Sequence, residues 1–177
     1  GIEVKPDNLY ILTNETIKNC TTYNVEKNKI KISPLRTDWI KNNPRNSEGA
    51  FIRADNGAIL FAYSRYTGES NHDHASCDIA LITSFDEGET WENPRILIQR
   101  DEESRNLMCP SLLLLPDGRI LAAHQMGEAF ESVDGTTCIS ISEDGGKSWS
   151  KPQKAFDKAS EAIPLTDCSK PTLLPDG

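Results

Sequence analysis

A turn sequence of eight residues that occurs twice is the feature that most restricts the fold. It reads SFDEGETW at residues 84–91 and SEDGGKSW at residues 142–149, which places the two tryptophans 58 residues apart. A second signal repeats with nearly the same period, because Asn-Gly or Asp-Gly occurs at residues 56–57, 117–118 and 176–177. Two independent markers that share one period indicate a repeat architecture.

Each repeat predicts four short antiparallel strands. Asn-Gly or Asp-Gly between apolar runs is a strong hairpin signal, and both turn residues are expected to take positive φ. Helical periodicity is absent. A repeated four-stranded unit of this size describes a propeller blade, so we expect an all-β propeller of which the chain holds about two and a half blades. The strands are expected at residues 50–54, 58–65, 77–84 and 95–98, then 111–115, 120–125, 136–142 and 153–156, with 170–174 opening a third blade.

The repeated turn is predicted to be a folding device and not a catalytic motif. Its aspartate can accept backbone N–H bonds across the turn, and its serine hydroxyl can do the same. Its glycine can take a backbone conformation that is costly for other residues, and its tryptophan is expected to insert between sheets. The residues in these structural roles are Ser84, Asp86, Gly88, Trp91, Ser142, Asp144, Gly146 and Trp149.

Composition excludes several classes of partner. The chain has 177 residues, enough for one sizeable domain, and its 37% hydrophobic and 26% charged content is that of a globular protein. The net charge of −8 and the lack of a basic run argue against nucleic acid and anionic membrane surfaces. The longest apolar run, residues 58–63, is too short to span a bilayer.

Cysteine usage and the N-terminus bear on the compartment. The five cysteines are odd in number and show no CxxC or Cys/His ligand spacing, which favours reduced thiols over a disulfide framework. No leader is visible in the opening GIEVKP. Both observations favour the cytoplasm, but the chain lacks an initiator Met and its N-terminus looks cut, so a secreted protein stays an alternative.

The chain is expected to have two parts. Residues 1–46 are polar and rich in Asn and Lys, and they form an extension that is a candidate for the strand closing the ring. The remainder is expected to be a partial propeller with a first blade at about 47–100, a second at about 106–160 and the start of a third at about 168–177.

Chemistry is expected at the end of the blades opposite the tight turns. In an antiparallel blade the first and third connections emerge together, whereas the second connection and the crossing to the next blade emerge at the other end. Loops on a rigid scaffold carry function more often than tight turns do. The longer segments at this second end are residues 45–49, 65–76, 97–110 and 125–135.

The richest of these segments is RYTGESNHDHAS at residues 65–76. Arg65 at a strand end can fork onto a carboxylate, and Asp73 can act as a general acid or base when partly desolvated. A solvated polar loop is the alternative. His72 and His74 flank Asp73, but alternate residues of one loop form a weak ligand set, so neither a metal nor a cofactor is expected.

From residue 45 to the end, the chain resembles the sialidase (neuraminidase) superfamily of Asp-box, or BNR, repeat proteins. The two repeated turns are Asp boxes. The stretch GAILFAYSR at residues 57–65, the acid-bearing loop after it and DIAL at 78–81 look like the first blade of sialidases. The resemblance implies a six-bladed propeller and retaining release of terminal sialic acid, with a Tyr nucleophile supported by a Glu.

Carried onto this chain, the resemblance assigns two roles and meets one departure. Arg65 would contact the sialate carboxylate or neighbouring groups, and Asp73 would be the acid/base residue. Glu48 stands where the first arginine of the family's carboxylate-binding triad would be, and Arg53 lies on the opposite side of the strand from it. A carboxylate there would repel sialate, which favours another glycoside with Glu48 as a working acid.

Three further residues lie at the same end, and two functions stay open. Asn106, Gln125 and Glu128 are candidates for contacts to sugar hydroxyls, with loop ordering as the alternative. The protein is expected to be an exo-acting glycoside hydrolase, or else a non-catalytic propeller that binds glycan or protein. Its expected partners are a glycan and the remaining blades of the same propeller, which carry the rest of the family's machinery. This piece alone is expected to be inactive.

Overall fold

The computed structural model describes residues 24–25, 30–31, 42–102, 104, 106–127 and 135–155. The predicted start of a third blade and Glu128 lie outside these residues. The chain divides into two compact units, Gly1–Thr37 and Asp38–Gly177. In the first unit, β1 (Asn24–Val25) pairs antiparallel with β2 (Ile30–Lys31).

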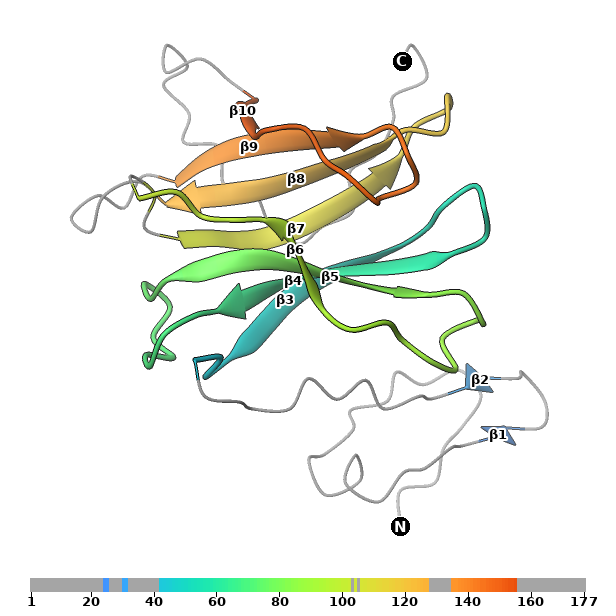
Figure 1. Ribbon diagram of the computed structural model, residues 1–177, viewed down its shortest axis with the longest axis horizontal. Helices are drawn as coiled ribbons and strands as arrows, with labels where there is room; N and C mark the ends of the chain where they lie inside the picture. The colour runs from blue at the N-terminus through green and yellow to red at the C-terminus, as the bar shows by residue number, and fades with distance from the viewer. Residues whose placement is uncertain are drawn as a thin grey trace. The chain divides into compact units, whose positions relative to one another are not determined.

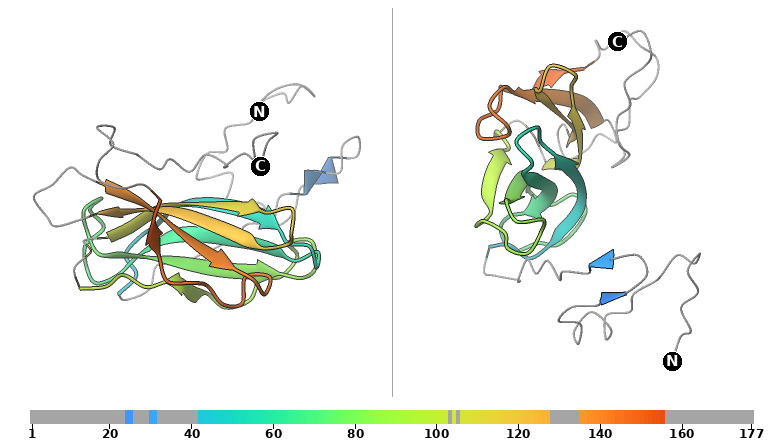
Figure 2. Two further views of the ribbon diagram at one scale, coloured as in Figure 1. Left: turned by 90° about the horizontal axis from the view of Figure 1, so that it is seen from above. Right: turned by 90° about the vertical axis from the view of Figure 1, so that its right-hand side faces the viewer.

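The second unit contains two antiparallel sheets, each of four strands bonded in chain order (Figure 1). The views in Figure 2 show one sheet lying over the other. The part of the chain that the structure describes contains no helix, and the prediction of repeated all-β blades is confirmed. The strands are β3 (Asn46–Arg53), β4 (Ile59–Tyr66), β5 (Cys77–Ser84) and β6 (Arg95–Ile98), then β7 (Asn106–Leu114), β8 (Ile120–Gly127), β9 (Gly135–Ser142) and β10 (Gln153–Lys154).

The first strand of each blade is longer than predicted and contains a bulge. β3 starts at Asn46 and β7 at Asn106, and the pairing register shifts between Ser47 and Gly49 in β3 and between Met108 and Ser111 in β7. A bulge adds one residue and so changes which side chains share a face of the sheet. Strand alternation alone therefore cannot place the residues that precede these shifts.

The hairpins turn through one left-handed glycine each, so the prediction of positive φ at both turn residues is wrong. Gly57 and Gly118 have φ of +85° and +86°, whereas Asn56 and Asp117 are not in this region. The Gly57 N–H donates to the Ala54 carbonyl at 2.9 Å. The four-residue turn that this bond closes ends at the left-handed glycine, and such a hairpin has a longer loop than the two-residue form.

Each Asp box is closed by its own serine and aspartate. In the second box, Ser142 Oγ bonds Asp144 Oδ1 at 2.8 Å and accepts the Gly146 N–H at 2.8 Å. Ser148 Oγ donates to Asp144 Oδ2 at 2.6 Å, and bonds from Ser148 hold the pKa of Asp144 well below its usual range. The first box makes the same three bonds with Ser84, Asp86, Gly88 and Thr90.

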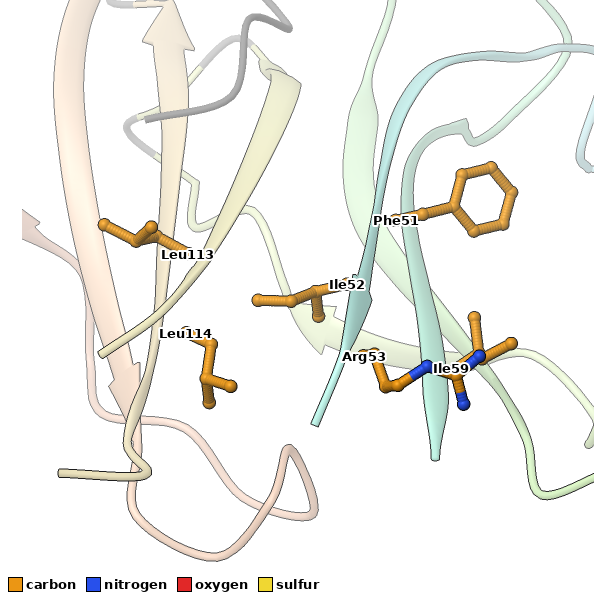
Figure 3. A pocket seen from close by; sticks show the side chains of 6 residues that line it. All are labelled: Phe51, Ile52, Arg53, Ile59, Leu113 and Leu114. Atoms are coloured by element: carbon orange, nitrogen blue, oxygen red, sulfur yellow. The ribbon is translucent and has the colours of Figure 1, made fainter. Parts of the chain in front are cut away.

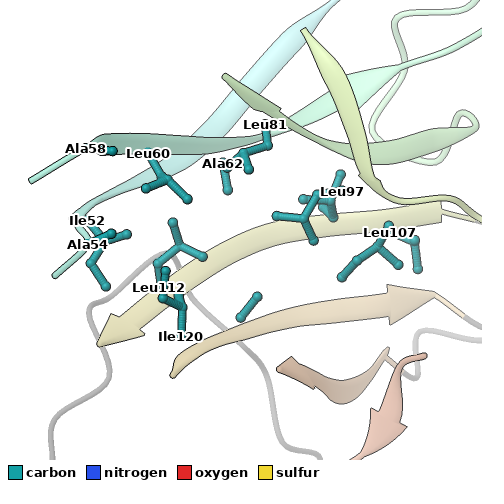
Figure 4. Packing of buried hydrophobic residues seen from close by; sticks show 13 residues of the cluster. Ile52, Ala54, Ala58, Leu60, Ala62, Leu81, Leu97, Leu107, Leu112 and Ile120 are labelled. Carbon is teal, nitrogen blue, oxygen red and sulfur yellow. The ribbon is translucent and has the colours of Figure 1, made fainter. Parts of the chain in front are cut away.

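The two blades share one hydrophobic core (Figure 4). Trp149 of the second Asp box packs against this core. Arg95 of the first blade donates to the carbonyls of Gly146 and Lys147 in the same box, the second at 3.1 Å. The second box is thus bonded to the first blade. The core includes Ile52, Leu60, Ala62 and Leu81 from the first blade and Leu107, Leu112, Ile120 and Ala122 from the second.

His124 is a buried imidazole on the inward face of the second blade. It lies two residues after Ala122 on β8, so the two side chains share the face that packs on the first blade. Its side chain is 0% exposed, and neither ring nitrogen has a hydrogen-bond partner within the described part of the chain. Burial lowers its pKa from 6.5 to about 4, because the charged ring would lose its solvation.

Stability is therefore expected to fall as the pH drops from about 6.5 to about 4. Between these pH values the unfolded chain binds a proton at His124 that the folded chain does not, so the free energy of unfolding falls. Above pH 6.5 the imidazole is neutral in both states, and no stability is lost. The loss amounts to about 3 kcal/mol. Urea unfolding at several pH values would measure it, and His124→Met, which cannot titrate, should lack this component. Parallel pH curves for the two proteins would contradict the assignment.

Candidate functional site

The candidate site lies at the end of the blades opposite the Asp boxes. There, residues 67–76 connect β4 to β5, and β3 and β7 both begin. The connecting loop is held at its base, where the Thr67 N–H donates to the Ser76 carbonyl at 2.8 Å. The described strands thus bring the predicted loop and the starts of two first strands to one end.

Arg45 is the centre of the polar cluster at this end. The Tyr66 N–H donates to the Arg45 carbonyl at 3.0 Å, so Arg45 stands opposite Tyr66 on the neighbouring strand. Its guanidinium carbon lies 4.6 Å from the centre of the Tyr66 ring, within the range of a cation–π contact. Arg45 Nη1 donates to Asp73 Oδ1 and, at 3.3 Å, to the Asn71 carbonyl, while Nη2 lies 3.6 Å from Glu48 Oε1.

Asp73 is held from two sides. Arg45 bonds its carboxylate, and Asn106 at the start of β7 donates from Nδ2 to the Asp73 backbone carbonyl at 2.9 Å. The Asp73 side chain is 69% exposed, whereas that of Arg45 is 29% exposed. Two residues predicted from the sequence, Asp73 and Glu48, therefore face Arg45, and a third, Asn106, bonds the backbone of Asp73.

The charges of the cluster are set by these contacts. The hydrogen bond from Arg45 and its positive charge lower the pKa of Asp73, so this carboxyl is ionised at neutral pH. Burial raises the pKa of Tyr66 to about 12, so its phenol stays neutral. The Tyr66 hydroxyl lies 3.6 Å from Met108 Sδ of the second blade. The cluster combines one cation, two carboxylates and a neutral phenol.

The other predicted residues lie apart from this cluster. Arg65 pairs across the sheet with Asn46 and Asp78, and it lies on the opposite face of β4 from Tyr66. Gln125 stands in β8 opposite Met108 and Thr137. Arg65 and Asp73 are thus not brought together in the described residues.

Arg45 is the residue that the sequence analysis did not identify. Counted by simple alternation from Arg53, it would share the face of Phe51, away from Tyr66. The bulge between Ser47 and Gly49 moves it to the face of Tyr66. The signal present in the sequence was that Arg45 opens the segment at residues 45–49, which is expected at the same end of the blades as the loop at 65–76.

A groove lies at the hairpin end of the blades and offers no such chemistry. Figure 3 shows Ile52 directed between the two first strands, with Phe51 turned away. Among the described residues that line it, Arg53 is the one with a charge, and Arg53 already forms a two-bonded ion pair with Glu87, at 2.8 and 2.7 Å. The groove is lined by Phe51, Ile52, Arg53, Ile59, Leu113 and Leu114.

The described residues hold neither a metal-ligand cluster nor a disulfide. In the described ranges, no group of three or more His, Cys, Asp or Glu side chains is placed to hold a metal ion. No disulfide forms among the three cysteines that the structure describes, Cys77, Cys109 and Cys138. The same residues include no helix with the length and apolar character to cross a membrane.

Comparison with known proteins gives a family match and several similar folds. The model of the BNR repeat-like domain matches residues 39–177, whereas no curated protein matches. Among solved structures, a Hadza microbial sialidase has a TM-score of 0.54 and 19% identity, covering 64% of this chain and 26% of its own. A Trypanosoma rangeli sialidase mutant with trans-sialidase activity has a TM-score of 0.52 and 17% identity, covering 73% and 22%.

A third solved structure is the intramolecular trans-sialidase from Ruminococcus gnavus in complex with oseltamivir carboxylate. It has a TM-score of 0.53 and 10% identity, covering 64% of this chain and 49% of its own. This chain thus spans between about a fifth and a half of the three solved chains. At these identities the likeness concerns the propeller fold.

Proposed function

The chain belongs to the BNR repeat-like domain family and has the propeller fold of the sialidase superfamily, and from this premise we propose that the whole protein is an exo-acting sialidase. The reaction would release a terminal sialic acid from a glycoconjugate. Because the chain spans less than half of the solved sialidases it resembles, the proposal concerns the full-length protein.

The cluster around Arg45 is the observation that supports this proposal. A guanidinium can bind a carboxylate ligand through two parallel hydrogen bonds. Arg45 places a guanidinium at the site end of the first strand. From the sequence, Glu48 was the residue of segment 45–49 that received a role, and its repulsion of sialate is offset by Arg45, 3.6 Å from its carboxylate. The cluster therefore offers a cation for an anionic sugar.

Roles follow from the chemistry of each side chain. Asp73 would transfer the proton at the glycosidic oxygen. Arg45 would bind the sialate carboxylate, alongside Arg65 or in its place. Asn106, and with it Gln125 and Glu128, would contact sugar hydroxyls. The nucleophile would come from a part of the protein outside this chain.

The test is turnover of a fluorogenic sialoside by the full-length protein, measured by release of the fluorophore. The methyl ester of the same sialoside, which lacks the carboxylate charge, should be turned over at least tenfold more slowly, because Arg45 then has no anion to bind. A fluorogenic neutral galactoside serves as the second control. If the protein hydrolyses the galactoside but not the sialoside, its substrate is a neutral sugar and not sialic acid.

A non-catalytic glycan-binding propeller is the second candidate function. The observation that favours it is the pairing of Arg45 with two carboxylates, since Glu48 and Asp73 both compete with an incoming anion. Calorimetric titration with N-acetylneuraminic acid separates the candidates: binding without turnover of any of the three glycosides would establish a binding protein.

A further inference from the structure

We propose that Arg45 is a switch: it bonds Asp73 in the ligand-free protein and transfers this bond to the substrate carboxylate, which releases Asp73 as the proton donor. The inference rests on the proposed function and adds a step to it. It concerns the order of events at the site: the substrate carboxylate binds first, and its binding allows Asp73 to become protonated.

The two partners of this ion pair are held very differently. Arg45 is fixed by its place beside β3, by the Tyr66 N–H on its carbonyl and by the Tyr66 ring against its guanidinium. Asp73 lies in a loop, and its side chain is 69% exposed. Asn106 bonds the Asp73 backbone carbonyl and not its carboxylate, so within the described residues the bond from Arg45 is what holds the carboxylate in place. The carboxylate of Asp73 is therefore the partner that moves.

Competition at the guanidinium favours such an exchange. Arg45 already faces two carboxylates, Asp73 and Glu48, and a substrate carboxylate would be the third. Exposed ion pairs contribute little net free energy, so a ligand bound through many other contacts can displace one of them. Glu48 is bonded by Ser47 Oγ and lies within β3, whereas Asp73 lies in a loop, which leaves Asp73 as the displaced group.

The exchange also solves a problem of protonation. While Arg45 bonds it, Asp73 is a carboxylate with a lowered pKa and has no proton to donate. Once the guanidinium binds sialate, Asp73 loses that bond and faces an added negative charge, so its pKa rises and it takes a proton from water. The other titratable groups that act on the Asp73 carboxyl are His72 and His74, while Glu48 and the Tyr66 ring face the guanidinium of Arg45.

The proton balance of the step is complete. Asp73 donates its proton to the glycosidic oxygen as the bond from that oxygen to the sugar breaks, and the oxygen keeps the electron pair. The sugar passes to the nucleophile supplied by the rest of the protein. Asp73 then accepts a proton from the water that releases the sugar, which restores the protonated acid.

The experiment follows the Asp73 carboxyl itself, by ¹³C NMR of the full-length protein labelled at aspartate, with Asp73→Asn to assign the resonance. In the ligand-free protein, Arg45→Gln should raise the pKa of Asp73 by about one unit or more. Arg45→Lys keeps the charge and should leave it near the wild-type value. Saturating N-acetylneuraminic acid should raise it by about one unit in the wild type, and its methyl ester should not.

The three possible results separately test the Arg45–Asp73 bond, the release of Asp73 on ligand binding, and the proposed function. An unchanged Asp73 pKa in folded Arg45→Gln would overturn the bond that the switch requires. Sialic acid that binds without moving this pKa would overturn the release step and leave the proposed function standing. If the full-length protein neither binds nor hydrolyses sialosides, the proposed function is rejected, and the release step with it. The comparison of the ligand-free proteins still decides whether Arg45 bonds Asp73.

Discussion

Asp73→Asn is expected to lower kcat for an unactivated sialoside by a factor of about 10²–10⁴, the range that a general acid contributes. The amide keeps the size of the carboxyl and can still bond to neighbours, but it has no proton to transfer at neutral pH. The effect should depend on the leaving group, because a phenol leaves with less help from an acid than a sugar alcohol does. Steady-state kinetics on an aryl sialoside and on a sialyl disaccharide measure the loss of kcat and its dependence on the leaving group.

Glu69→Gln is the matched control for this experiment. Glu69 lies in the same exposed loop between β4 and β5, so the change removes a carboxylate of the loop without touching Arg45. It should leave both rates within about twofold of the wild type. Equal losses on the two substrates in Asp73→Asn would point to a positioning role and reject proton donation by Asp73.

Gly146→Ala is expected to destabilise the protein by about 4 kcal/mol, from backbone strain and overpacking together. Gly146 has φ of +89°, and a Cβ there would overlap Cδ2 of Leu60, which is fully buried. The residue cannot shift to relieve this, since Ser142 bonds its N–H while Arg95 and Trp149 bond its carbonyl. Urea unfolding would measure the loss.

Gly88→Ala separates the two causes. Gly88 holds the equivalent place in the first Asp box with φ of +82°, but among the described residues its Cβ would meet only Trp91, at 3.7 Å. This variant should show the backbone strain alone, about 1–2 kcal/mol. Equal destabilisation by the two alanines would mean that the contact with Leu60 adds nothing.

The fold was predictable from the sequence because its markers are local. The strands Cys77–Ser84 and Arg95–Ile98 lie where the apolar runs around the first Asp box place them. The starts of β3 and β7 were predicted too late because their first residues precede a bulge, which interrupts the strand alternation and leaves no composition signal of its own. The hairpin error has a similar origin, since Asn-Gly fits more than one turn type.

The site was predictable only in part. Asp73 and Asn106 follow from loop position, since the topology brings the second connection and the crossing between blades to one end. Arg45 depends on two facts that one sequence does not contain, the register shift that turns it toward Tyr66 and the path that carries Asp73 back to it. Arg65, the arginine with the clearer sequence pattern, lies on the other face of β4.

The bonds from Arg95 to the second Asp box have a consequence for the order of folding. A ribosome delivers the first blade, with Arg95 and Leu60, before the turn that they contact. The earlier blade can then act as a template on which the later turn assumes its shape. We expect assembly to proceed vectorially, from the N-terminus toward the C-terminus, so that a defect in Arg95 would delay the maturation of the blade made after it.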